Sequence, residues 1–191
     1  MTNSSIGIRA SRKKLIVTIL LVFIAGMVAA GLFNTGLSAT NEMEFCTSCH
    51  SMKVNLEEYK ETIHFKNPSG VRATCSDCHV PKAFIPKMIA KVVAAKDVYH
   101  EILGTIDTKE KYEAHRWDMA NRVWAKMKAS DSRECKTCHA FDQMDLSEQD
   151  RMARKRHGKA VDQGKTCIDC HKGIAHEEPD EPEEEEPENT G

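Results

Sequence analysis

The sequence predicts a mainly α-helical protein with one membrane-spanning helix followed by a small domain, and three observations predict it. An uncharged run of 19 residues, Leu15 to Phe33, lies near the N-terminus. Two later stretches, 84–103 and 113–128, have apolar residues at helical spacing. The chain also repeats a short motif, Cys-x-x-Cys-His, four times. We therefore divide it into an N-terminal segment (1–14), an anchor (15–33), a motif-bearing domain (34–176) and a tail (177–191).

The uncharged run is long enough to form a single-pass anchor, since a helix rises about 1.5 Å per residue and a hydrocarbon core is about 30 Å thick. A cleaved signal peptide is the alternative. Its apolar region usually has about 7–15 residues, however, and Leu37-Ser38-Ala39 is a poor cleavage site. Basic residues but no acidic ones precede the run: Arg9, Arg12, Lys13 and Lys14. The positive-inside rule thus leaves 1–14 in the cytoplasm and exports the rest.

The repeated motif predicts covalently attached haem. A haem bound through its two vinyl groups needs two thiols about one turn apart and a neighbouring imidazole for the iron. Disulfide-stapled loops or two zinc sites of four thiolates are alternatives, but neither explains a histidine after every second cysteine. We expect four haem c groups, attached at Cys46, Cys49, Cys75, Cys78, Cys135, Cys138, Cys167 and Cys170, with iron ligands His50, His79, His139 and His171.

Composition and charge agree with a haem-dominated domain in the periplasm of a bacterium, anchored in the inner membrane. Only 6% of the residues are aromatic, so we expect the haems to supply much of the core. The tail carries nine acidic residues, and we expect it to be disordered and solvating. Without it the net charge of −2 becomes +7, and the domain keeps about +3 of this once the four cytoplasmic cations are set aside. We expect no nucleic-acid partner, and a homo-oligomer remains open.

The motif spacing predicts two duplicated di-haem units. The motifs begin 29, 60 and 32 residues apart, which makes two pairs. The second motif of each pair reads Thr-Cys-x-Asp-Cys-His and follows a glycine, Gly70 or Gly164. A lone histidine also precedes each, at His64 and His157. Matching positions suggest matching roles, most simply as second axial ligands of haem iron.

The duplication is lopsided after these motifs. His176 follows the fourth motif, whereas the stretch after the second contains Lys82 and no histidine. Three distal candidates, His64, His157 and His176, therefore serve four irons, because His100 and His115 have no counterpart in the repeat and are expected to be ordinary residues. We assign the gap to the first haem. Met52, two residues after His50, is a candidate ligand there or a packing residue.

The two stretches with helical spacing have different expected roles. In 84–103, Pro86 suits a first helical turn and Gly104 a stop. This helix either packs on haems or lies at the membrane interface with its lysines at the headgroups. Asp97, the one acid between Lys82 and His100, either accepts a proton or pairs with a lysine. The stretch 113–128 is expected to bridge the di-haem units, with Trp117 and Trp124 packing on haems.

Several segments resemble the NapC/NirT family of membrane-anchored tetrahaem cytochromes, over almost the whole chain from the anchor to His176. They are 33–36, 70–75, 78–81, 86–89 and 166–176. The resemblance implies oxidation of membrane quinol, whether menaquinol or ubiquinol, and electron transfer to a periplasmic reductase or its small cytochrome subunit, most closely a nitrate reductase. It also implies that Lys91 corresponds to the lysine of the quinol site and Asp97 to the acid beside the first haem. Met52 resembles the methionine of a Cys-x-x-Cys-His-x-Met motif in the family's nitrite-reductase branch.

The expected mechanism is quinol oxidation beside the first haem. Lys91 would hydrogen-bond a quinol oxygen and Asp97 would take a proton. One alternative is a passive electron-transfer module fed by a separate quinol-oxidising subunit. Another is reduction of nitrite at the open haem, which is weaker because no second cluster of acid, base and arginine accompanies any motif. The terminal reductase and the quinone type stay open.

Overall fold

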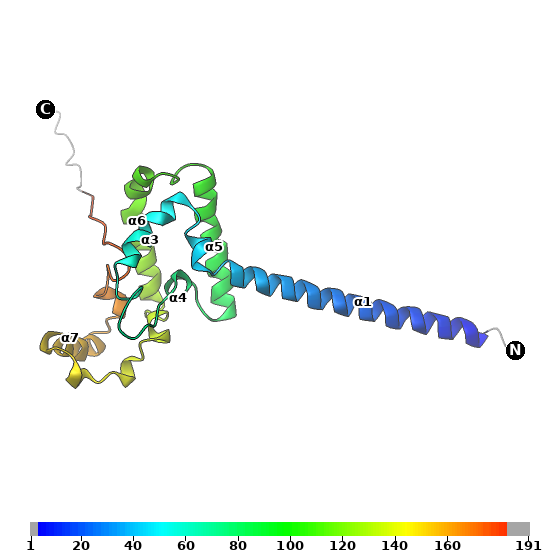
Figure 1. Cartoon of the computed structure of the whole chain (residues 1–191). Coiled ribbons are helices and arrows are strands. Elements are labelled where there is room, and N and C mark those ends of the chain that lie inside the picture. The colour runs from blue at the N-terminus through cyan, green and yellow to red at the C-terminus, as the bar shows by residue number, and fades with distance from the viewer. Residues whose placement is uncertain (1–3, 183–191) are drawn as a thin grey trace, which may run out of the picture. The chain divides into compact units, whose positions relative to one another are not determined.

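A computed structural model describes residues 4–182, and the chain divides into two compact units, one ending at Glu42 and one beginning at Met43 (Figure 1). Helices joined by turns and loops make up both units, and residues 4–182 contain no strand. The prediction of a mainly helical chain is confirmed. Residues 183–191, most of the predicted disordered tail, lie outside the described residues.

The first unit is the single helix α1 (Ser4–Ala39). It contains the predicted anchor and runs six residues past Phe33, because no proline ends it there and the Thr35 hydroxyl donates to the Gly31 carbonyl at 2.9 Å. Within Arg12–Ala39, an 18-residue window has a mean hydropathy of 2.8, and none of that window is buried. By length and composition this part of α1 can cross a membrane.

The second unit holds all four motifs. Its α-helices are α2 (Met43–Cys46), α3 (His50–Lys60), α4 (Cys75–His79), α5 (Phe84–Ile102), α6 (Lys109–Ala129) and α7 (Arg151–Asp162). Its 3₁₀ helices are η1 (Cys135–Thr137), η2 (Phe141–Gln143), η3 (Leu146–Glu148) and η4 (Cys167–Asp169). The two helices predicted at 84–103 and 113–128 are confirmed as α5 and α6. Helix α6 begins earlier than predicted because the Thr108 side chain caps it, accepting from the Lys111 N–H at 3.3 Å.

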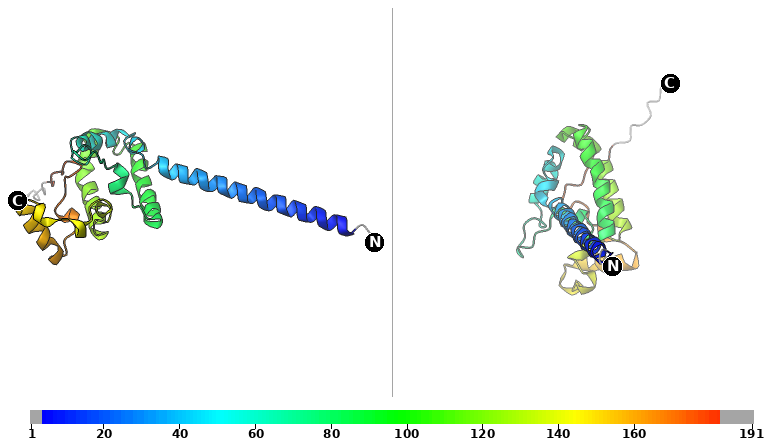
Figure 2. Two further views of the ribbon diagram at one scale, coloured as in Figure 1. Left: turned by 60° about the horizontal axis from the view of Figure 1, so that its bottom comes forward. Right: turned by 90° about the vertical axis from the view of Figure 1, so that its right-hand side faces the viewer.

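Helix α6 connects the two halves of this unit, as the sequence predicted. It lies beside α3 (Figures 1 and 2), where the Tyr112 hydroxyl donates to Asn55 Oδ1 at 2.8 Å. Beyond the other end of α6, the buried Ser132 accepts from the Ile168 N–H at 3.1 Å. The fourth motif is thereby tied to the chain that leads into the third.

The apolar core is small. Among the described residues, the buried apolar side chains are Tyr59, Pro81, Ala90, Ile106, Tyr112 and Ile168. A domain of this length normally buries a much larger set. This agrees with the expectation that haems supply much of the core.

Candidate functional site

Three of the four motifs form one short helical turn each. Helices α4, η1 and η4 start at the first cysteine of the second, third and fourth motifs. A single turn brings two thiols three residues apart to one side, the spacing that two haem vinyl groups require. The first motif is built differently, since Cys46 ends α2 and His50 begins α3. All eight thiols are free, and the four motif histidines are exposed.

The second motif of each pair begins with the same threonine–aspartate hydrogen bonds, which supports the duplication. Asp77 Oδ2 accepts from the backbone N–H and hydroxyl of Thr74 at 2.8 and 2.7 Å. Asp169 Oδ2 does the same with Thr166 at 2.9 and 3.0 Å. Each pair is a reciprocal capping box that fixes the start of the motif helix. Gly70 and Gly164 both have a left-handed backbone, with φ of 72° and 60°.

Each predicted distal histidine lies opposite a motif histidine. The ring centroids of His79 and His176 are 6.2 Å apart. Those of His64 and His139 are 6.1 Å apart, and those of His157 and His171 are 5.9 Å apart. The three distal rings are half-buried. The pairs cross between the repeats, because His64 faces the third motif and His176 faces the second.

These separations suit two imidazoles on opposite sides of one metal ion. A metal–imidazole bond is about 2 Å long, and the coordinating nitrogen lies about 1 Å from its ring centre, so the two centroids should be about 6 Å apart. The donor set therefore fits an iron held between two histidines.

Neighbouring polar groups orient the distal rings. The His157 Nδ1–H donates to Gln149 Oε1 at 2.6 Å, which leaves Nε2 available to bind a metal. The Tyr59 hydroxyl donates to the backbone carbonyl of His64 at 2.9 Å and fixes that turn. His64 Nδ1 itself is buried and has no hydrogen-bond partner among the described residues. Such a ring is held by its backbone rather than by its own hydrogen bonds.

The first motif lacks a comparable partner. No other imidazole makes a ring contact with His50 in the part of the chain that the structure describes. His100 Nδ1 lies 3.0 Å from Thr105 Oγ1, and His115 Nδ1 lies 2.8 Å from the Lys111 carbonyl, so both are engaged locally, as the sequence suggested. Met52 is half-buried, and residues two apart on a helix do not face each other. His50 and Met52 therefore point to different sides of α3.

The motifs adjoin one another in chain order. A hydrogen bond joins the thiols of Cys46 and Cys75, lowering the pKa of the first to about 7 and raising that of the second. Burial and then the Cys135 thiol raise the pKa of Cys78 to about 11. Burial and then the Cys167 thiol also raise the pKa of Cys135. The first motif thus adjoins the second, the second the third, and the third the fourth.

The predicted quinol-site residues lie on two sides of α5. Lys91 is half-buried near the first motif, where burial lowers its pKa and the Cys46 thiol acts in the opposite direction. Asp97 is exposed and, at six residues' distance, lies about 9 Å along the helix and about 120° around it. The structure does not bring these two side chains together. Lys82 pairs with Asp77, outside any ligand position.

Helix α5 also presents exposed apolar side chains. Ile85, Ile89 and Val92 lie along one stripe and are 64%, 59% and 72% exposed. They lie on the side away from the buried Ala90. An exposed apolar stripe of this kind is typical of a surface that meets lipid or another apolar partner.

The zinc and disulfide alternatives find no support in this arrangement. In residues 4–182 no three side chains of histidine, cysteine, aspartate or glutamate converge on a site of metal-ion size. Pairs of imidazoles and separate pairs of thiols suit a metal that already has its in-plane ligands, as iron in a porphyrin does.

Sequence reasoning missed the residues that hold the motifs and distal histidines in place. Glu101 accepts from the His50 N–H at 3.1 Å and from the Ser51 hydroxyl at 2.6 Å, capping α3 from 50 residues away. Gln149, Glu58 and Arg116 were missed in the same way. Of these residues, only Glu101 could have been noticed in the sequence, because it is a lone charge among apolar neighbours. Trp117 and Trp124 pack edge-to-face at 6.0 Å, and Lys172 lies 4.1 Å from the Trp124 ring.

Comparisons with known proteins agree with this geometry. Residues 8–181 match the sequence model of the NapC/NirT cytochrome c family, N-terminal region. The NapC cytochrome of Escherichia coli K12 is 52% identical over 171 residues, 89% of this chain and 86% of that protein. The denitrification component NirT of Stutzerimonas stutzeri is 54% identical over 158 residues, 82% and 79% of the two chains. A tetraheme cytochrome c of Allochromatium vinosum is 60% identical over 164 residues, 86% and 89% of the two. No solved structure matches.

Proposed function

This chain belongs to the NapC/NirT cytochrome c family, and from that premise we propose that it oxidises membrane quinol and passes the electrons to a periplasmic reductase, with nitrate reductase as the proposed acceptor. Membership makes it a membrane-anchored tetrahaem c-type cytochrome that acts in electron transfer to periplasmic reductases. The observation that carries the finer proposal is the contrast between three paired motif histidines and one unpaired one.

The residues proposed to hold the haems follow from the motif turns and the ring pairs. Four cysteine pairs would attach the haems, and the pairs His79/His176, His139/His64 and His171/His157 would hold the second, third and fourth irons. The first iron takes His50 or Met52 on one side only. When bound, haem irons accept and release one electron at a time. The side chains of this protein would supply two ligands to each of three irons and only one ligand to the first iron.

The order of the motifs supports a single route. A thiol hydrogen bond joins the first motif to the second, and thiols of the third and fourth motifs raise the pKa of Cys78 and Cys135 in the motif before each. Electrons from quinol would therefore enter at the motif nearest the anchor and leave near the fourth motif. Helix α7 has five exposed basic residues there, Arg151, Arg154, Lys155, Arg156 and Lys159.

The proposed quinol site lies where α5 meets the first motif. Lys91 is half-buried there, so its ammonium group is placed to donate to a quinol oxygen. The exposed Asp97 would pass a proton to the periplasm, because it has open access to water. The apolar stripe of Ile85, Ile89 and Val92 would rest at the membrane surface, where a lipid-soluble quinol enters. This is the interfacial form of α5 that the sequence left open.

The proposed orientation follows from the charges that flank the anchor. Arg12, Lys13 and Lys14 precede the apolar part of α1, so residues 1–14 would stay in the cytoplasm and the haem domain would be periplasmic. A bacterial inner membrane is the proposed location, because it borders the periplasm where haem is attached covalently.

Reconstitution tests the proposal against a passive electron-transfer module. The full-length haem-loaded protein is placed in liposomes with no other protein, and a menaquinol or ubiquinol analogue is added. We expect rapid reduction of the haems, seen in the visible absorption. Haems that stay oxidised with quinol but are reduced by dithionite would instead favour the passive module. The terminal acceptor is tested separately, by adding purified periplasmic nitrate or nitrite reductase.

A further inference from the structure

Arg116 is a buried cation at the contact between α3 and α6. Only 8% of this residue is exposed. Its guanidinium group binds both carboxylate oxygens of Glu58, with Nη1 2.7 Å from Oε1 and Nη2 bound to Oε2. Glu113 lies 3.2 Å away on the outer side. The side chains of Arg116 and Glu58 are 9% and 12% exposed. In the surface ion pair Lys111–Asp107 the exposed fractions are 49% and 42%, so the Arg116–Glu58 pair is far less solvated.

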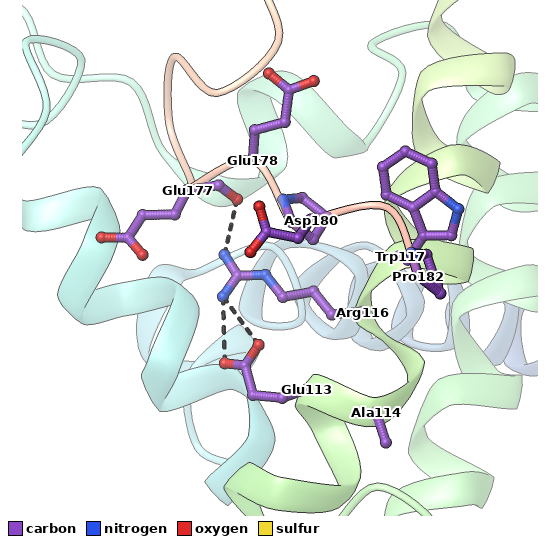
Figure 3. A pocket seen from close by; sticks show the side chains of 9 residues that line it. Glu113, Ala114, Arg116, Trp117, Glu177, Glu178, Asp180 and Pro182 are labelled. Atoms are coloured by element: carbon purple, nitrogen blue, oxygen red, sulfur yellow. Dashed lines mark hydrogen bonds and ion pairs between the residues drawn. The ribbon is translucent and has the colours of Figure 1, made fainter. Parts of the chain in front are cut away.

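The same pair binds the backbone of the residue that follows His176. The Glu177 N–H donates to Glu58 Oε2 at 2.9 Å, and Arg116 Nη2 donates to the Glu177 carbonyl at 2.9 Å. Figure 3 shows the guanidinium group between the Glu113 carboxylate and the Glu177 carbonyl. Because both polar backbone groups of one residue are held by a rigid, charged pair, its position and direction are fixed. We call Glu58 and Arg116 the Glu177 clamp.

His176 depends on this clamp more than the other distal histidines depend on their surroundings. His157 is held within α7, and His64 by the Tyr59 hydroxyl. Residues 171–182, in contrast, contain no helix or strand. A cavity of about 320 Å³ lies between this segment and α6, lined by Glu177, Glu178, Pro179, Asp180 and Pro182 on one side and by Glu113, Ala114, Arg116 and Trp117 on the other, so the segment packs loosely on α6 (Figure 3).

We propose that Glu58 and Arg116 are positioning residues for the second haem. The clamp holds the backbone of Glu177 and so keeps the His176 ring 6.2 Å from His79, the separation that one iron between them requires. This inference rests on the ligand pair in the proposed function. An ion pair that only joined α3 to α6 would need no contacts with the Glu177 backbone. Buried ion pairs of this kind are better suited to fixing one geometry than to adding stability.

The test uses the double variant E58Q/R116Q of the full-length, haem-loaded protein. It removes both charges together, so no unpaired charge is left buried. Because the glutamines cannot reproduce the charged two-point grip, we expect His176 to leave the iron. Reduced protein should then bind one further carbon monoxide per chain, and one low-spin bis-histidine haem signal should be lost, with all four haems still attached.

Two further variants make the result specific. R122Q changes an exposed arginine on the same helix and should leave carbon monoxide binding unchanged. H176A should show the same loss as the double variant, and combining it with E58Q/R116Q should add nothing more. An H176A protein that keeps every low-spin signal would overturn the ligand pair and the clamp together. If H176A loses the signal but E58Q/R116Q keeps it, or loses haem at all sites, the clamp alone is wrong.

Discussion

The surroundings of the first motif and of the other three differ in one respect that organises the molecule. Around the second, third and fourth motifs, every motif histidine faces a second histidine at 5.9–6.2 Å. At the first, Glu101 binds the helix end that carries His50, and Lys91 lies nearby instead of an imidazole. In the proposed function, the three paired sites carry electrons only, and the first motif is the one left open to a substrate.

The comparison also shows how a duplicated unit acquires different roles. The capping boxes at Thr74 and Thr166 and the left-handed glycines before them are the same in both repeats. The distal histidines are not used in parallel, because His64 and His176 each face a motif in the other repeat. His157, in contrast, faces the fourth motif within its own repeat, so the three distal histidines lie opposite the second, third and fourth motifs and none lies opposite the first.

The largest predicted effect comes from removing the haems, because the four motif sites should not form without them. The core has few buried apolar residues, so a chain with all eight cysteines changed to serine should lack a cooperative thermal transition. Circular dichroism in detergent checks this, with the haem-loaded protein as control. A native-like, cooperative melt of the haem-free chain would contradict the account.

Changing one distal histidine should turn a paired site into an open one. His157→Ala should convert the fourth haem from low-spin to five-coordinate, and the reduced protein should then bind one more carbon monoxide per chain. His115→Ala is the matched control, since His115 makes only a local hydrogen bond. Unchanged ligand binding in the His157 variant would show that this ring is not a ligand.

Lys91 should affect the open site alone. Lys91→Gln should lower the rate of haem reduction by quinol about tenfold, a loss of about 1.4 kcal/mol of transition-state stabilisation. Haem content and the low-spin signals should not change. Lys96→Gln, an exposed lysine on the same helix, controls for charge. Quinol kinetics equal to those of the unaltered protein would remove Lys91 from the site.

The smallest effect is expected from Met52→Leu. The substitution keeps the volume, so it should cost less than about 1.5 kcal/mol of unfolding free energy. Any spectral change should be confined to the first haem, because the three histidine pairs do not include Met52. Resonance Raman spectra of the variant check this, and a change in the paired haems would count against the assignment.

Most of the fold and the ligand set could be predicted from the sequence, because the signals are local. The Cys-x-x-Cys-His motifs, the uncharged run to Phe33 and the helical spacing in 84–103 each lie within a few turns of chain. Matching the repeats also pointed to His64 and His157, and the lopsided end of the second repeat pointed to His176. In these cases a short stretch contains both the chemical group and the reason for its position.

The pairing of ligands and the residues that support them could not be predicted. His64 reaches the third motif, and Glu58 reaches Glu177 across 119 positions of sequence, contacts that no local pattern encodes. That Lys91 and Asp97 point to different sides of α5 became clear only once the position of each residue around the formed helix was known. Long-range contacts between ordinary polar residues leave no periodicity, so only the folded chain reveals them.

The central claim is that the first haem alone is open and alone meets quinol. Magnetic circular dichroism of the oxidised full-length protein, recorded with and without a non-oxidisable quinol analogue, tests it most directly. The account predicts three low-spin bis-histidine haems that the analogue leaves unchanged and one different haem whose signal shifts. Four bis-histidine haems, or a shift in one of the three paired haems, would contradict it.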